Sequence, residues 1–304
     1  MATDTIRIAT RESALALWQA EHVAGLIEES PALGHATLVP MTTRGDQILD
    51  RSLNKVGGKG LFIKELEHAM LEGRADIAVH SMKDVPAEMP DGFVLAAVLE
   101  REDPRDALVG STLDELRDGA TVGTSSLRRA AQLARLRPDL NIQPLRGNVN
   151  TRLAKLDAGD YDAIVLATAG LKRLGFDARI SEALPVTTML PAVGQGIVGI
   201  ECLASDAALR ERLKILEDAT ATITIAAERA VAATLGATCH SPLGVHATLA
   251  DDELSVTALL LSADGTTALT EAAQGPATEA QALGEQVASA MLANGASELL
   301  VEAP

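Results

Sequence analysis

The sequence has few aromatic residues, and this shortage excludes one class of partner. Aromatic residues make up 2% of the 304 residues, with one Trp, one Tyr and three Phe. Proteins that bind nucleic acid usually present stacking aromatic rings or a basic surface, whereas the formal net charge of this chain is −16. We therefore expect no nucleic-acid partner.

Cysteines and long apolar runs are also scarce. Cys202 and Cys239 are too few for a disulfide framework, and no Cys-x-x-Cys or His-x-x-x-His spacing indicates a metal site. No run of 18 apolar residues occurs, and the start, Met-Ala-Thr-Asp-Thr-Ile-Arg-Ile, has no basic region before an apolar run. We expect an unprocessed, soluble protein of the reducing cytoplasm, with no metal and no membrane partner.

One segment of this acidic chain is strongly basic. Residues 121–152 carry six arginines against a single acid, Asp139, so the local charge is six minus one, or +5. Neighbouring guanidiniums repel one another, so such a cluster indicates an anionic ligand. Arg135 and Arg137 stand late in a predicted helix, where cations complement the helix dipole, and we interpret them as a solvated helix face. The other four arginines follow predicted strands or begin helices: Arg128, Arg129, Arg146 and Arg152.

Short β-branched runs alternate with helical stretches through the first 200 residues. This alternation predicts an α/β fold with mostly parallel sheets that helices cover on both faces. The tail differs, because alternating segments separated by Asp-Asp and Asp-Gly predict antiparallel hairpin strands. The predicted strands cover residues 6–9, 38–43, 76–80, 93–99, 120–122, 142–145, 163–167, 244–249, 254–261 and 266–272. The predicted helices are one capped by Ser13 and those over residues 62–71, 127–136, 149–156, 222–235 and 277–292.

Residues 194–199 match the dinucleotide-binding pattern G-x-G-x-x-G. That pattern must follow a strand and open a helix. Here Pro191 precedes it, and residues 197–202 continue as a strand. We therefore interpret the glycines as a tight turn that enters a strand.

The glycine-rich loop over residues 44–60 is also no nucleotide site. It places a Lys among glycines at 57–60, but Leu61 stands where a phosphate-binding loop needs Ser or Thr for magnesium. A long glycine-rich loop that carries Lys55 and Lys59 predicts a mobile cationic lid instead.

Cys239 and His240 are neighbours in a turn-rich loop. Adjacent residues point in different directions, so His240 is poorly placed to activate Cys239 as a nucleophile. A lone cysteine is commonly a small buried apolar group. The alternative is a thiol that faces a cleft, because the loop over residues 235–244 joins a helix to a hairpin. The residues alone leave both interpretations open.

Four motifs stand at the ends of predicted strands, where open parallel sheets bind ligands. Helix-start N–H groups, hydroxyls and forked guanidiniums form an anion cradle at such places. The four are Ala-Thr-Arg-Glu-Ser at 9–13, His-Ser-Met-Lys-Asp-Val-Pro at 80–86, Gly-Thr-Ser-Ser-Leu-Arg-Arg at 123–129 and Arg-Gly-Asn-Val-Asn-Thr-Arg at 146–152.

Together with the motifs at 57–62 and 190–196, these segments resemble the porphobilinogen deaminase (hydroxymethylbilane synthase) family over nearly the whole chain. The resemblance implies three domains. The first two are similar to the halves of periplasmic binding proteins, with mostly parallel sheets, and the third is a small α+β domain with an antiparallel sheet. The implied boundaries are 1–99 with 196–216 for domain 1, 100–195 for domain 2 and 217–304 for domain 3.

The resemblance also implies a reaction. Such a transferase deaminates four porphobilinogen molecules, polymerises them head-to-tail on a covalent dipyrromethane primer, and hydrolyses off hydroxymethylbilane. Cys239 matches the thioether position, and a thiolate attacks the electrophile left by loss of ammonia. Asp84 matches the catalytic carboxylate, which can bind pyrrole N–H groups and stabilise developing positive charge.

The same match assigns the remaining site residues. For the cofactor they are Lys83, Ser81, Asp46, Thr124, Ser125, Ser126, Arg128, Arg129 and Arg152. For the substrate they are Arg11, Ser13, Arg146, Arg173, Phe62 and Gln195. The family further implies a cytoplasmic monomer of heme and tetrapyrrole biosynthesis that passes its product to uroporphyrinogen III synthase.

This chain departs from the family pattern in two places. Ala237 and Thr238 replace two glycines before the cofactor cysteine, and Met82 replaces a common Leu. Two other classes of protein remain as alternatives. One is a cytoplasmic anion-binding module of the periplasmic-binding-protein type, which requires neither Cys239 nor Asp84. The other is a Cys-dependent hydrolase with a free, reactive Cys239.

Overall fold

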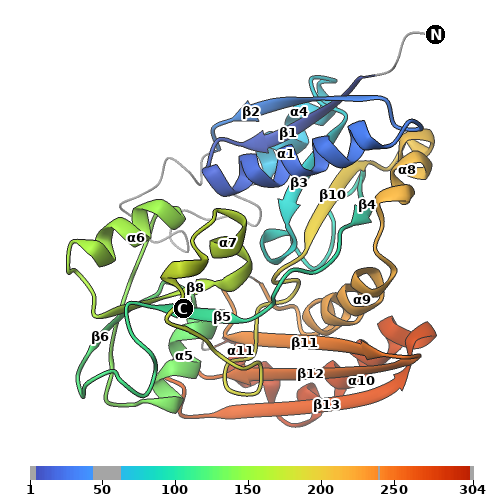
Figure 1. Cartoon of the computed structure of the whole chain (residues 1–304). Coiled ribbons are helices and arrows are strands. Elements are labelled where there is room, and N and C mark those ends of the chain that lie inside the picture. Colours follow the sequence, from blue (N-terminus) through green and yellow to red (C-terminus); the bar gives the residue numbers. More distant parts are fainter. Residues whose placement is uncertain (1–4, 44–62, 239, 302–304) are drawn as a thin grey trace. The chain divides into compact units, whose positions relative to one another are not determined.

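The computed structural model describes residues 5–43, 63–238 and 240–301 (Figure 1). Contacts divide the chain into two compact units. Unit 1 comprises Met1–Arg101 and Ile197–Thr222, and unit 2 comprises Glu102–Gly196 and Ile223–Pro304. Within the described ranges, every helix is too short or too polar to cross a membrane.

Unit 1 is built on a five-stranded sheet in the order β2-β1-β3-β10-β4. Strand β1 pairs in parallel with β2 and β3, whereas β10 pairs antiparallel with β3 and β4. Four of the five strands therefore run in one direction, and β10, the first strand after the chain re-enters the unit, runs against them. The bounds are β1 (Thr5–Arg11), β2 (His35–Met41), β3 (Ile77–Ser81), β4 (Phe93–Val98) and β10 (Val198–Leu203).

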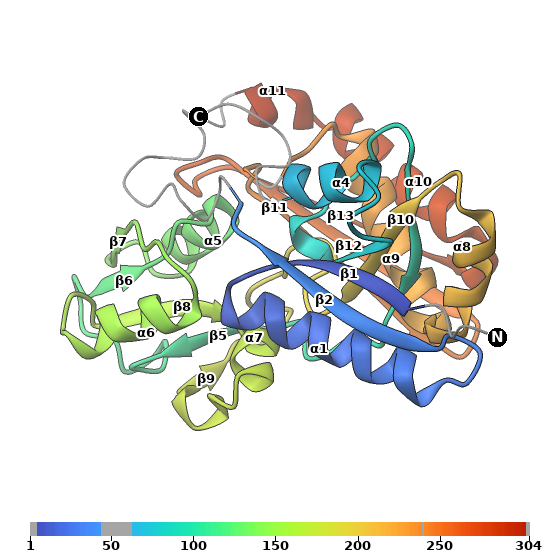
Figure 2. The same ribbon diagram turned by 90° about the horizontal axis from the view of Figure 1, so that it is seen from above.

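Helices cover both faces of this sheet because strand side chains alternate between the faces. Helix α1 (Ala14–Glu29) covers the face that carries Ile8 and Ile77, and α8 (Ala207–Leu213) packs on β4 at the same face, whereas α4 (Lys64–Leu71) packs on the other face, which carries Ala78. Figure 2 shows α1 lying along the sheet. The loops that follow β1 and β3 lie at the carboxyl edge of the sheet.

Unit 2 repeats this pattern with a sheet in the order β7-β6-β8-β5-β9. Strand β6 pairs in parallel with β7 and β8, and β5 pairs antiparallel with β8 and β9, so four of the five strands again run one way. Helix α5 (Leu127–Leu136) covers one face, and α6 (Val149–Asp157) and α7 (Thr168–Arg173) cover the other. The bounds are β5 (Asp106–Val109), β6 (Thr121–Gly123), β7 (Asn141–Gln143), β8 (Ala163–Ala167) and β9 (Glu182–Ala183).

A three-stranded antiparallel sheet in the order β11-β12-β13 completes unit 2. At the β12–β13 turn, a Cβ added to Gly265 would lie 2.3 Å from the carbonyl oxygen of Ala131, so this turn packs tightly on α5. Its elements are β11 (Leu243–Ala250), β12 (Glu253–Leu261), β13 (Ala268–Pro276), α9 (Ala219–Thr234), α10 (Ala280–Ala293) and α11 (Ala296–Val301).

The predicted fold class is confirmed, with two mostly parallel sheets and a third, antiparallel sheet. Strand β5 was not predicted, because its first residue is an aspartate, which is unusual in a buried strand. The short helices α7 and α8 were not predicted either. The three domain boundaries given above remain a prediction.

Candidate active site

Unit 1 brings together two of the predicted loops. Strands β1 and β3 are parallel neighbours, with Ile8 opposite Ile77, so their carboxyl ends lie at one edge of the sheet. Arg11 ends β1, and the Ser13 hydroxyl caps α1 by accepting a hydrogen bond from the backbone N–H of Ala16 at 3.4 Å. The cap fixes where the helix begins and turns the chain away from the edge.

The loop after β3 presents a carboxylate. Met82–Asp84 form a single 3₁₀ turn, η1, in which Met82 is 1% exposed and Asp84 is exposed. On the strand just before it, the Ser81 hydroxyl accepts a hydrogen bond from Gln19 Nε2 at 2.8 Å. Asp84 and the half-buried Lys83 therefore stand on a turn whose base is fixed in the sheet.

Unit 2 supplies a loop of hydroxyls between β6 and α5. Thr124 Oγ1 accepts a hydrogen bond from the backbone N–H of Ser126 at 3.2 Å, and Ser125 Oγ donates to the Leu145 carbonyl at 3.0 Å. Ser126 caps α5, accepting from the N–H of Arg129 at 3.5 Å. These contacts preform the helix start, which is a favourable place for an anion.

Two of the predicted cofactor-binding arginines lie in an internal ion cluster. Arg128 and Arg129 are 4% and 5% exposed, and both contact the fully buried Asp106. Arg128 Nη1 donates to Asp106 Oδ2 at 2.7 Å, and Arg129 Nη2 donates to Asp106 Oδ1 at 2.7 Å. The same guanidiniums also donate to the carbonyls of Leu190 and Val165. Two cations against one carboxylate leave the cluster with a net charge of +1.

Gln195 joins this cluster. Its Nε2 donates to Asp106 Oδ1 at 3.0 Å and to the Pro104 carbonyl at 2.6 Å. Burial alone would raise the pKa of Asp106, but the charges of Arg128 and Arg129 lower it well below its usual range. The cluster therefore stabilises the fold above the ordinary pKa of Asp, about 3.9, and this contribution is lost only as the pH falls through the lower folded-state pKa.

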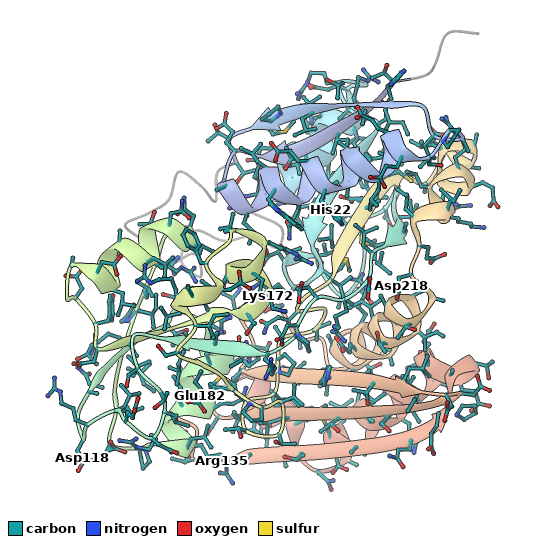
Figure 3. All side chains as sticks on the ribbon, viewed as in Figure 1. His22, Asp118, Arg135, Lys172, Glu182 and Asp218 are labelled. Carbon is teal, nitrogen blue, oxygen red and sulfur yellow. The ribbon has the colours of Figure 1, made fainter. Side chains whose placement is uncertain are left out.

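Replacing Asp106 with asparagine is expected to destabilise unit 2 by about 3–5 kcal/mol, because two buried guanidiniums lose their counter-charge. Urea unfolding followed by circular dichroism measures the loss. Asp118→Asn is the matched control, because the Asp118 side chain is 98% exposed and lies 3.8 Å from Arg137 at the periphery of the unit (Figure 3). Equal stability of the two variants would contradict a stabilising role for the cluster.

The loop between β7 and α6 carries two more arginines. Arg152 Nε donates to the Gly147 carbonyl at 2.8 Å, and the Arg146 carbonyl accepts from Lys155 Nζ at 3.3 Å. Gly147 has a φ of +114°, which only glycine adopts without strain, so the loop turns sharply just after Arg146. Arg146 and Arg152 thus flank one sharp turn at the start of α6.

His240 lies within electrostatic reach of Arg146. Burial lowers the pKa of His240, and the positive charge of Arg146 lowers it further. Around it, the N–H of Ser241 donates to the Thr238 carbonyl at 2.9 Å, and the N–H of Thr238 donates to Ser241 Oγ at 3.1 Å. Two hydrogen bonds therefore join Thr238 to Ser241, and His240 is near the arginine loop of the same unit.

The remaining basic residues differ in what their side chains contact. Arg173, at the end of α7, donates to the Gly196 carbonyl at 2.7 Å, and burial lowers its pKa. Arg135 is exposed, as its predicted solvated position requires (Figure 3). Arg137 differs from the prediction, because it donates to Asp139 and to the Leu113 carbonyl at 2.8 Å each.

Five predicted site residues lie outside the described part of the chain: Asp46, Lys55, Lys59, Phe62 and Cys239. Three buried acids of the described residues were not predicted. Asp106 pairs with the arginines, Glu201 Oε2 lies 2.7 Å from His80 Nε2, and Glu228 accepts from the Gly194 N–H at 2.7 Å. In the sequence, each of these acids lies in or beside a short apolar run. That pattern indicates burial, but it does not identify the residue that the carboxylate contacts.

The fold and these loops define an α/β protein in which each unit has arginines, hydroxyls and helix starts at its strand ends, where anions are favoured. Residues 6–211 match the model described as porphobilinogen deaminase, dipyromethane cofactor binding domain, and residues 222–293 match porphobilinogen deaminase, C-terminal domain. The chain belongs to the porphobilinogen deaminase family. It is a transferase of tetrapyrrole biosynthesis that acts on porphobilinogen, with dipyrromethane as its cofactor, as the resemblance implied.

Several solved structures are similar to part of this chain. The VFT2 domain of BvgS from Bordetella pertussis is 16% identical, with 69% of this chain and 84% of that chain covered and a TM-score of 0.42. An ABC transporter structure from Parabacteroides distasonis is 14% identical, with 69% and 70% covered and a TM-score of 0.44. A TRAP periplasmic solute binding protein from Ralstonia eutropha is 14% identical, with 74% and 79% covered and a TM-score of 0.39. We draw nothing about function from these likenesses.

Proposed function

We propose that this chain joins four porphobilinogen molecules head-to-tail on a dipyrromethane primer held through a thioether to Cys239, and then hydrolyses off hydroxymethylbilane. Each addition releases one ammonia. The observation that carries the proposal is the exposed Asp84 carboxylate on a turn anchored in the sheet, beside Lys83, in a chain of this family.

Asp84 is the catalytic carboxylate in this proposal. As ammonia leaves the aminomethyl group, positive charge develops on the pyrrole ring, and a fixed carboxylate stabilises it. The same oxygens accept hydrogen bonds from pyrrole N–H groups and hold the ring in place. Asp84 can also carry a proton between the departing and attacking groups.

The residues of unit 2 fit a ligand that bears several carboxylates. Among the described residues, the buried Arg128 Nε has no hydrogen-bond partner, and the arginine cluster keeps one net positive charge. When bound, dipyrromethane supplies the free α-carbon to which the first substrate ring is joined. The residues that we propose to hold it are Ser81, Lys83, Asp46, Thr124, Ser125, Ser126, Arg128, Arg129 and Arg152.

The substrate carries an acetate and a propionate, which forked guanidiniums bind in pairs of hydrogen bonds. We assign this binding to Arg11, Ser13, Arg146, Arg173 and Gln195, with Phe62 packing on a pyrrole ring. Lys55 and Lys59 form a cationic lid in the same proposal. Gln195 is 1% exposed and bonded to Asp106, so its contribution passes through the loop that it fixes.

Three further features belong to the proposal. The protein acts as a monomer in the cytoplasm, and its product passes to uroporphyrinogen III synthase. Because hydroxymethylbilane is a reactive linear molecule, a following enzyme that closes the ring must consume it.

Stoichiometry tests the proposal. Purified protein incubated with porphobilinogen is expected to release four ammonia molecules per linear tetrapyrrole, measured by an ammonia assay and by mass spectrometry of the product. A protein that binds porphobilinogen without releasing ammonia would be an anion-binding module instead. Ammonia release with a product of another chain length would contradict the proposed four-ring sequence.

A further inference from the structure

Gly199 has no conformational reason to be glycine. It lies within β10, where it pairs with His80 on one side and Val98 on the other. It is absent from the described residues with positive φ, so any residue can adopt its backbone conformation. Glycine in a strand interior weakens the strand, and its presence often marks a close approach by another group.

That group is the side chain of Met82. A Cβ added to Gly199 would lie 2.3 Å from Met82 Sδ and 3.2 Å from Met82 Cγ. The next atom, Leu95 Cδ2, would be at an ordinary 3.4 Å. Met82 is 1% exposed, so its thioether cannot swing into solvent to make room. The Met82 side chain therefore occupies the space that a side chain at position 199 would need.

Met82 is the first residue of the turn that carries Asp84. Its N–H donates to the Ile197 carbonyl at 3.0 Å, which extends the β3–β10 ladder into the turn, and its carbonyl accepts from the N–H of Val85 at 3.1 Å. A displacement of Met82 therefore moves both ends of this three-residue turn.

The sheet beneath the turn is fixed on both faces. On the face that α1 covers, Gln19 bonds Ser81 at 2.8 Å. On the other face, His80 Nε2 lies 2.7 Å from Glu201 Oε2, with the two side chains 6% and 0% exposed. Because these contacts hold β3 in place, we expect a collision at Gly199 to displace Met82 and the turn that it begins.

We propose that Gly199 is a positioning residue. Because it has no side chain, it leaves room for Met82, and Met82 in turn holds the Asp84 carboxylate in its catalytic position. Gly199 touches no reacting atom and acts through Met82 and η1. The inference rests on the proposed catalytic role of Asp84. It also gives a function to the third glycine of the segment at 194–199, whose match to the dinucleotide-binding pattern does not indicate a nucleotide site.

Gly199→Ala tests the proposal. Because alanine suits a strand better than glycine, any loss comes from the collision and not from the backbone. Misplacement of a catalytic group by about 1 Å costs about 100-fold in rate, so we expect kcat to fall about 10- to 100-fold with KM nearly unchanged. Gly25→Ala is the matched control, since a Cβ there meets nothing within 4 Å, and it should keep full activity.

The double variant Gly199→Ala with Met82→Ala supplies the decisive comparison. Removing the thioether relieves the collision, so its kcat should exceed that of Gly199→Ala alone, and it keeps the test available if the single variant fails to fold. A purely structural role would lower thermal stability without a selective fall in kcat. That result, or a double variant whose kcat is no higher than that of Gly199→Ala, would overturn the proposal. Asp84→Asn, measured in the same assay, distinguishes failure of the catalytic role of Asp84 from failure of the positioning role of Gly199. If it keeps full activity, the role of Asp84 is wrong; if it loses activity while Gly199→Ala does not, only the positioning role is wrong.

Discussion

Asp84→Asn is expected to lower kcat by about 10²- to 10³-fold, the usual cost of removing one fixed stabiliser of transition-state charge. Asparagine keeps the shape of the side chain, but it cannot offset the positive charge that develops as ammonia departs. Asp84 is exposed, so the substitution should leave the fold intact. Steady-state kinetics with porphobilinogen measure the fall, and intact mass should show the cofactor still attached.

The matched control is Asp91→Asn, the same exchange at another exposed position of unit 1. It should leave both kcat and KM unchanged, because removing a surface charge away from a site has little effect. Wild-type kcat in Asp84→Asn would show that another group stabilises the transition state. A rise in KM alone would indicate that Asp84 only binds the substrate.

Cys239→Ser is expected to abolish both cofactor attachment and turnover. In the proposed function the thiolate is the nucleophile that forms the thioether, whereas a serine hydroxyl stays protonated and unreactive at neutral pH. Intact mass spectrometry measures the effect directly. The wild-type protein should exceed its sequence mass by two linked pyrrole units, and the variant should show the sequence mass alone.

Cys202 offers the control for this experiment. It is fully buried in the core of unit 1, and burial raises the pKa of its thiol to about 11, so it carries no thiolate at neutral pH. Cys202→Ala should therefore keep the pyrrole mass. An unmodified wild-type protein with a reactive thiol would favour the Cys-dependent hydrolase, and a variant at Cys239 that keeps the extra mass would place the attachment elsewhere.

Much of the fold could be predicted because its signals are local. The predicted helix over 127–136 has the observed bounds of α5, and Ser13 caps α1 as its position indicated. The strand β5 was missed because it begins with Asp106, a charged residue whose counter-charges, Arg128 and Arg129, lie far along the chain. The direction of β10 could not be predicted either, since antiparallel pairing with β3 depends on where the chain re-enters the unit.

The candidate site shows the same division. The motifs after β1 and β3 predicted a shared edge, and parallel pairing brings Arg11 and the Asp84 turn to neighbouring strand ends. The basic segment predicted an anion site, but its charges have different uses. Arg128 and Arg129 form ion pairs with Asp106, and Arg137, which follows α5, donates to the Leu113 carbonyl. Charge alone does not show which of these arginines also has an internal counter-charge.

The sequence by itself determined the alternation of strands and helices, the helix starts and the family, because each is recorded in residues that are neighbours along the chain. Only the tertiary structure decided which arginine has an internal partner and why residue 199 is glycine. Arg128 and Asp106 are 22 positions apart, and Gly199 meets Met82 across two paired strands. Such contacts depend on strand order and register, which arise when buried side chains of distant segments pack together.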